Sequence, residues 1–425
     1  MDKIIRNNFL IIGIFCTMNI IKIPIINLSL AYIFLFITLL MLITRNRFKI
    51  NIGKRNIKLI LFYIIQIASF LITVTYQTGE YITYSFRNIF FVAFLYIPLV
   101  LVLDNEDTKI YGEYFCKGLK ISIYIQSVWA IMEILLWNIY KFQLNEYIFA
   151  EILKVNAYDH SLTNYVYTNQ GVLIRASGIG WEPAQLGFLL VLGFFISKSK
   201  LSKLFFISLI FISYSRTALV TFIIAEIYFC IKRITKENLM TKKNLIYIFF
   251  GVFIMLALMV KFDIYSKMDV IFGRINLSYI SSDEGSSRHL LYYPYALYIM
   301  FAKTDLIKLF LGYGTGIAGY PYFLNSDVAS VLNVGYWSKP WQPETDYVSI
   351  FVGNGIMGLV LYLSILRDNL KRIKDLNVFY LGNLLLVISG IFYVYYNYIW
   401  VNLILVFLCI SKNNVITSMK KNIKE

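Results

Sequence analysis

Charged residues are scarce in this chain, and their scarcity decides which solvent surrounds it. Asp, Glu, Lys and Arg make up only 15% of the 425 residues, against about 25% in soluble domains. Apolar residues reach 59%, and several apolar runs are as long as the roughly 20 residues that span the hydrocarbon core of a bilayer. The composition excludes an ordinary soluble domain and predicts an all-α integral membrane protein.

Histidine and cysteine are also too few for metal chemistry. The two histidines, His160 and His289, are scattered, and the four cysteines lie within or beside apolar runs at no metal-like spacing. The sequence shows no Gly-rich phosphate loop beside a strand, and its polar segments contain no aspartate cluster of the kind that holds Mg²⁺. We therefore expect no metal and no cofactor.

The net charge of +16 has an explanation in membrane topology rather than in nucleic-acid binding. No basic-aromatic module for nucleic acid is present. Instead, 27 of the 40 basic residues fall in short segments between apolar runs, and only nine fall in two long polar segments. Short cytoplasmic loops are rich in Lys and Arg. This bias predicts that both termini face the cytoplasm and that the two long segments face outside.

The apolar runs predict one polytopic domain over residues 1–425 with about twelve transmembrane helices. The two long extracytoplasmic loops are predicted at 138–183 and 262–345. The predicted spans are 8–21, 28–44, 59–75, 88–103, 119–137, 184–197, 204–214, 217–232, 244–261, 346–366, 377–393 and 396–410.

The first candidate site feature ends the first long loop. Arg175-Ala-Ser-Gly is followed by Glu182-Pro183 at the start of a predicted span. Pro183 suits the first turn of a helix, and Glu182 suits the positive end of the helix dipole. That structural role is one explanation of Glu182. The other is a carboxylate that orients or deprotonates a sugar hydroxyl at the membrane surface.

The second and third features place further arginines on the predicted outer side. Arg216 lies in a polar break between two apolar runs, where it either snorkels to lipid headgroups or clamps a diphosphate. Arg288 in the second long loop is followed by His289, Tyr292 and Tyr293, and we expect these three residues to contact sugar. A solvated loop arginine is the alternative for Arg288.

Arg175, Arg216 and Arg288 share one predicted side of the membrane. Three guanidiniums that converge there would stabilise a departing diphosphate without a metal. A carboxylate would accept the proton of the attacking hydroxyl. The candidates for this base are Asp346, Glu344 and Glu182, of which the sequence favours Asp346 or Glu344. Two further carboxylates, Glu133 and Glu226, lie inside apolar runs, where carboxylates are costly and often functional.

The order of these motifs resembles the O-antigen polymerase and ligase superfamily. The resemblance covers about 165–360. It rests on Arg175-x-Ser-Gly with Glu182-Pro183, Ser215-Arg216, Ser287-Arg288, Leu311-Gly-x-Gly314, and a polar residue eleven positions before Gly355-x-x-Gly358. The family pattern of ligases has a histidine at that last position, where this chain has Glu344.

The resemblance implies a GT-C-like membrane glycosyltransferase of the bacterial plasma membrane. Its donor would be an oligosaccharide on undecaprenyl diphosphate, and its acceptor a second lipid-linked repeat of O-antigen or capsule. A partner that regulates chain length is a further implication. Glu344 in place of histidine favours a polymerase over a ligase. A polysaccharide flippase or transporter is the third candidate, against which the absence of an internal repeat counts.

Overall fold

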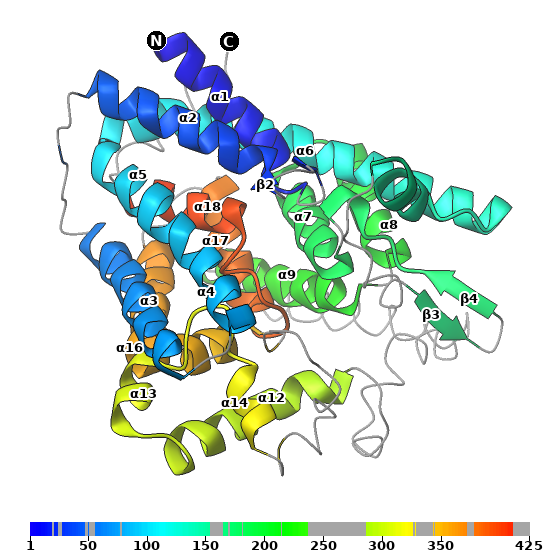
Figure 1. Ribbon diagram of the computed structural model, residues 1–425. Coiled ribbons are helices and arrows are strands. Elements are labelled where there is room, and N and C mark those ends of the chain that lie inside the picture. The colour runs from blue at the N-terminus through cyan, green and yellow to red at the C-terminus, as the bar shows by residue number, and fades with distance from the viewer. Residues whose placement is uncertain are drawn as a thin grey trace.

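The computed structural model is a bundle of helices around a few central ones (Figure 1). Two-stranded antiparallel pairs are the only strands in the described part of the chain. The structure describes residues 1–18, 21–23, 28–46, 50, 56–76, 79–153, 165–168, 171–180, 182–213, 215–236, 286–325, 328, 343, 345–371 and 378–410.

The first third of the chain forms two groups of helices, one along the top of Figure 1 and one that descends on its left side. In Figure 1, α1, α2 and the long α6 lie together along the top. A π-helical stretch, Val92–Tyr96, joins α4 to α5 in one continuous helix. The elements are α1 (Asp2–Phe15), β1 (Lys22–Ile23), β2 (Leu28–Ser29), α2 (Leu30–Arg45), α3 (Asn56–Tyr76), α4 (Gly79–Phe91), α5 (Ile97–Val102) and α6 (Asn105–Tyr140).

The rest of the chain supplies the central helices and a group on the opposite side. In Figure 1, α12, α13 and α14 lie at the bottom, and the β3–β4 hairpin projects at the right. These elements are a π-helical turn (Glu146–Ile152), β3 (Tyr165–Thr168), β4 (Gly171–Ile174), a 3₁₀ turn (Gly178–Gly180), α7 (Pro183–Ile196), α8 (Lys200–Ile212), α9 (Arg216–Lys236), α12 (Ser286–Ala302), α13 (Leu306–Leu311), α14 (Tyr320–Leu324), α16 (Asp346–Lys371), α17 (Val378–Ser389) and α18 (Ile399–Ile410).

Local chemistry fixes several helix ends. Asp104 starts α6, because its side chain accepts a hydrogen bond from the Asp107 amide at 2.8 Å. Lys141 ends the same helix in the left-handed conformation, with φ of 53°. Pro183 occupies the first turn of α7, where its missing N–H costs nothing.

The most buried helices are α7, α17 and α18. All residues from Pro183 to Gly193 are buried, as are nearly all residues of α18. A helix that is apolar around its whole circumference belongs in the interior. These helices therefore form the core on which the outer helices pack.

Other helices present apolar side chains outward. On α3, Leu61, Ile64 and Leu71 are exposed, and on α6 Val128 and Leu135 are exposed. Large exposed apolar surfaces are rare on soluble monomers. Four helical segments in the described part are long and apolar enough to cross a membrane: Asn56–Thr75, Ser85–Val102, Asn105–Tyr140 and Asp346–Lys371. These features indicate a membrane protein.

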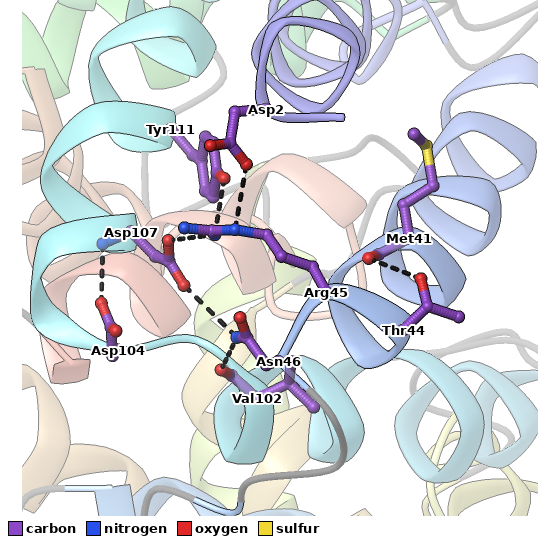
Figure 2. Close-up of polar contacts among 9 residues, drawn as sticks. All are labelled: Asp2, Met41, Thr44, Arg45, Asn46, Val102, Asp104, Asp107 and Tyr111. Atoms are coloured by element: carbon purple, nitrogen blue, oxygen red, sulfur yellow. Dashed lines mark hydrogen bonds and ion pairs between the residues drawn. The ribbon is translucent and has the colours of Figure 1, made fainter.

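Ion pairs tie helix ends together at two places. Figure 2 shows Arg45, at the end of α2, between Asp2 of α1 at 2.9 Å and Asp107 of α6 at 2.6 Å. The Arg45 guanidinium also donates to the Tyr111 hydroxyl at 2.8 Å. At the second place, Lys58 of α3 lies 2.6 Å from Asp368 of α16. Each pair joins segments that are far apart in sequence.

The long helix α16 is broken at Gly355, whose φ is 68°. The segment after α13 packs against this break with main-chain hydrogen bonds. The Tyr313 amide donates to the Val352 carbonyl at 2.9 Å, and the Gly314 amide donates to the Gly353 carbonyl at 2.9 Å. A Cβ at Gly355 would overlap the Phe310 carbonyl oxygen. Glycine is required there for both backbone conformation and space.

The helical class is confirmed, and eleven of the twelve predicted spans overlap helices. The twelfth, 244–261, lies outside the described residues. Helices also form outside the predicted spans. Residues 105–118 belong to α6, because Tyr111, Phe115 and Leu119 form a buried stripe at helical spacing. The second long loop contains α12, α13 and α14.

Candidate active site

Asp346 begins α16 and is completely buried. Its Oδ1 accepts hydrogen bonds from the amides of Tyr395 and Tyr396 at 2.6 and 2.8 Å, and its Oδ2 accepts one from the Tyr362 hydroxyl at 3.2 Å. The Asp346 amide in turn donates to the Gly390 carbonyl at 2.9 Å. This carboxylate fastens the connection between α17 and α18 to the start of α16.

Glu182 directly precedes α7 and is half-buried. Its side chain makes no capping hydrogen bond to the helix that it precedes. The first turn of α7 is held from another direction, because the Tyr395 hydroxyl donates to the Ala184 carbonyl at 3.1 Å. The helix-start role expected for Glu182 therefore does not use a capping bond.

Tyr395 connects the two carboxylates. Burial raises the pKa of its phenol well above the usual value, and the nearby Tyr398, Asp346 and Glu182 act in the same direction. The Tyr395 amide donates to Asp346, and the Tyr395 hydroxyl donates to the carbonyl of Ala184, two residues after Glu182. Tyr395 thus joins the segments that carry Glu182 and Asp346, which are 164 positions apart in sequence.

Arg216 is the first residue of α9 and is half-buried. The start of this helix lies against α7, because a Cβ at Gly187 would be only 2.8 Å from the Ser215 hydroxyl oxygen. Gly187 follows Pro183 by one turn of helix. The beginnings of α7 and α9, which carry Glu182 and Arg216, are therefore in close contact.

Tyr293 of α12 also reaches this region. Its hydroxyl donates to the Ile391 carbonyl at 2.8 Å and lies 3.0 Å from the hydroxyl of Thr345, the residue before Asp346. Tyr292 faces elsewhere: it is buried, and its ring meets the Tyr322 ring edge-on with centroids 5.9 Å apart. Of the two tyrosines predicted to contact sugar, Tyr293 is the one near Asp346.

The remaining predicted site residues are placed less fully. Arg175 is half-buried and lies in the segment between β4 and the 3₁₀ turn. Positions 288 and 289 lie in the first turn of α12, but the side chains of Arg288 and His289 fall outside the described part of the structure. Glu344 lies outside the described residues. The described residues contain no cluster of His, Cys, Asp and Glu that could hold a metal ion.

Tyr395 is the central residue that the sequence did not single out. The chain has 34 tyrosines, and no motif distinguishes this one. Its position four residues before the apolar helix α18 is typical of a membrane-interface tyrosine. Its neighbours are evident only from the fold.

Comparison with protein-family models gives no match to this chain, and comparison with curated proteins gives none either.

Proposed function

We propose that this chain is an integral membrane glycosyltransferase that polymerises polysaccharide repeats carried on undecaprenyl diphosphate. The observation that carries the proposal is the approach of Glu182, Asp346 and the start of α9 to one another around Tyr395 and α7. These are three of the motif segments on which the sequence resemblance to the O-antigen polymerases rests.

In the proposed reaction, a hydroxyl oxygen of the acceptor sugar attacks the anomeric carbon of the donor. The bond from that carbon to the diphosphate breaks, and undecaprenyl diphosphate leaves with the electron pair. Arg175, Arg216 and Arg288 would stabilise the negative charge that grows on the leaving group. The proton of the attacking hydroxyl passes to a carboxylate.

Glu182 is the best candidate for this base among the described carboxylates. Asp346 is fully buried and is occupied by two backbone amides and a tyrosine hydroxyl. Glu182 is half-buried at the start of α7. A carboxylate that must reach a bound hydroxyl needs such partial access. Asp346 would then hold the surrounding segments in place.

The proposed topology has twelve spans, cytoplasmic termini and an extracytoplasmic site. The ion pairs favour this topology, because they join only segments for which the charge bias predicts the cytoplasmic side. These pairs are Arg45 with Asp2 and Asp107, and Lys58 with Asp368.

The test is chain growth with the purified protein and a lipid-linked repeat in nanodiscs. We expect elongation by the wild type, a fall in turnover of about 10²-fold or more for Glu182→Gln, and a fall of about 10²-fold for Arg216→Ala. Lys141→Ala is the matched control, since Lys141 is exposed at the end of α6. Full activity of Arg216→Ala would contradict the diphosphate role.

Other products would identify the other candidate functions. Transfer to lipid A-core without chain growth would indicate a ligase. Movement of the intact lipid-linked sugar across proteoliposomes, with no new glycosidic bond, would indicate a flippase. Either result would overturn the polymerase proposal.

A further inference from the structure

We infer that Glu133, two turns before the end of α6, is a positioning residue for the segment that carries Arg175 and Glu182. The inference rests on the proposed function, because it concerns how that site is held. Glu133 is only 2% exposed. A carboxylate at such a depth is costly unless several hydrogen-bond donors surround it.

The donors around Glu133 come mainly from the segment that follows Arg175. Oε2 accepts from the amides of Ser177 and Gly178, at 3.2 and 2.7 Å. Oε1 accepts from the Ser177 hydroxyl at 3.1 Å and from the Asn145 side-chain amide at 2.6 Å. Both oxygens act only as acceptors, which a carboxylate can do and an amide cannot.

Neighbouring side chains also bind the segment that follows Arg175. Asn145 also donates to the Gly178 carbonyl at 3.1 Å, and its own oxygen accepts from the Trp129 indole at 2.6 Å. Gln126, two turns before Glu133 on α6, accepts from the Ile179 amide at 2.6 Å. Three consecutive amides, 177 to 179, are therefore held by side chains of one helix.

This arrangement fixes the site segment at two points. Residues 177–179 are attached to α6, and Ala184 is attached to Tyr395 at 3.1 Å. Glu182 lies between the two points, and Arg175 lies two residues before the first. A segment so held has little freedom, which lowers the entropic cost of binding. Loss of the Glu133 carboxylate removes the hydrogen bonds to Ser177 and Gly178 and leaves the bond between Tyr395 and Ala184 in place.

The experiment measures binding of undecaprenyl diphosphate to the purified protein in nanodiscs, together with KM and kcat for chain growth. We expect Glu133→Gln to weaken binding and raise KM for the donor by about 10-fold, with a smaller change in kcat. Ser177→Ala, which removes one donor and leaves the carboxylate, should weaken binding by less. Glu226→Gln is the matched control, since Glu226 is a half-buried carboxylate on another apolar helix.

A double-mutant cycle with Arg175→Ala separates positioning from general loss of structure. If Glu133 acts through the Arg175 segment, the loss of affinity in the double variant is clearly smaller than the product of the losses in the two single variants. Multiplicative effects, or wild-type affinity in both Glu133→Gln and Ser177→Ala, would overturn the inference.

The outcomes also distinguish the two proposals. If the wild type binds undecaprenyl diphosphate but transfers no sugar, and the cycle shows coupling, the polymerase proposal fails and the positioning role stands. If the wild type elongates chains and Glu133→Gln does so with unchanged KM and affinity, the positioning role fails alone. If the wild type neither binds the diphosphate lipid nor transfers sugar, both fail.

Discussion

Asp346 and Glu133 are buried carboxylates that accept hydrogen bonds from donors in another segment of the chain. Each accepts hydrogen bonds from two backbone amides and from at least one hydroxyl. Bonds to a charged acceptor stabilise more than bonds between neutral groups. At the residue scale, such carboxylates connect segments that are far apart in sequence through hydrogen bonds.

We predict that Asp346→Asn destabilises the protein by about 2–4 kcal/mol, because a neutral amide oxygen accepts more weakly from the Tyr395 and Tyr396 amides, and the amide nitrogen in place of Oδ2 cannot accept from the Tyr362 hydroxyl. The check is the apparent unfolding temperature of the purified protein in detergent. Glu182→Gln should leave that temperature almost unchanged while lowering turnover. A fully stable Asp346→Asn variant that lacks turnover would instead make Asp346 the base.

Asp305→Asn is the control for this prediction, because Asp305 is an exposed helix cap. Its side chain accepts from the Lys308 amide at 2.9 Å and lies 2.8 Å from the Lys308 ammonium. The hydrogen bond from Lys308 lowers the pKa of Asp305. A lowered folded-state pKa stabilises above the ordinary carboxyl pKa, and this contribution is lost as pH falls through the folded value. The variant should lose less than about 1 kcal/mol at neutral pH.

The sequence predicted the positions of Glu182 and Arg216 at helix starts, because Pro183 and a polar break mark those points. It did not predict that Asp346 would be buried. That burial depends on the connection between α17 and α18, which folds back onto the start of α16. Contacts between distant segments leave no local pattern in a single sequence.

At the scale of elements, α1 and α6 cross with their backbones in contact. A Cβ at Gly118 would lie 3.0 Å from the Gly13 Cα and would overlap the Leu10 carbonyl oxygen. Small residues allow this approach between helices in membranes, where packing takes the place of the hydrophobic effect. The crossing brings Thr17 beside Ser122, with their hydroxyl oxygens 2.6 Å apart.

We predict that Gly118→Ala pushes α1 from α6 and destabilises the protein by about 1–3 kcal/mol, despite the higher helix propensity of alanine. The measurement is again the apparent unfolding temperature in detergent. Gly382→Ala in α17 is the control. Its Cβ would meet only the flexible end of Ile404, 2.9 Å away at Cδ1. Equal stability of the two variants would show that the close crossing is not required.

Element boundaries were harder to predict than element type. The predicted span 119–137 is the apolar part of α6, whereas the helix runs from Asn105 to Tyr140. Charged residues such as Lys109 and Lys117 obscure its first three turns in a search for apolar runs. The stripe of Tyr111, Phe115 and Leu119 is the helical signal there. The break in α16 depends on the segment after α13 and was not predicted.

At the scale of the whole molecule, charge was the most informative feature of the sequence. The positive-inside bias grouped distant segments by side, and the ion pairs of Arg45 and Lys58 join segments within one such group. The neighbours of Tyr395 belong to the other predicted group. The sequence predicts a side for each helix end, because insertion acts on each loop separately. It could not pair individual ends, because pairing is decided by packing.

This grouping makes a direct prediction for accessibility. Single cysteines are placed at four exposed positions, in a background that lacks the four native cysteines, and right-side-out vesicles are treated with an impermeant maleimide. Lys141→Cys and Lys303→Cys should be labelled in sealed vesicles, because both positions belong to the predicted outer side. Lys200→Cys and Lys371→Cys should react only after permeabilisation.

Position 371 is the decisive one, since α16 connects it directly to Asp346. If Lys371→Cys reacts in sealed vesicles, the end of α16 that carries the Asp368–Lys58 pair faces outside. The Asp346 end would then face the cytoplasm, along with Glu182 and Tyr395. A site there could not act on repeats displayed on the outer leaflet, because neither the sugar nor its diphosphate crosses the hydrocarbon core unaided. Protection of position 371, together with labelling at positions 141 and 303, is therefore required of an extracytoplasmic polymerase.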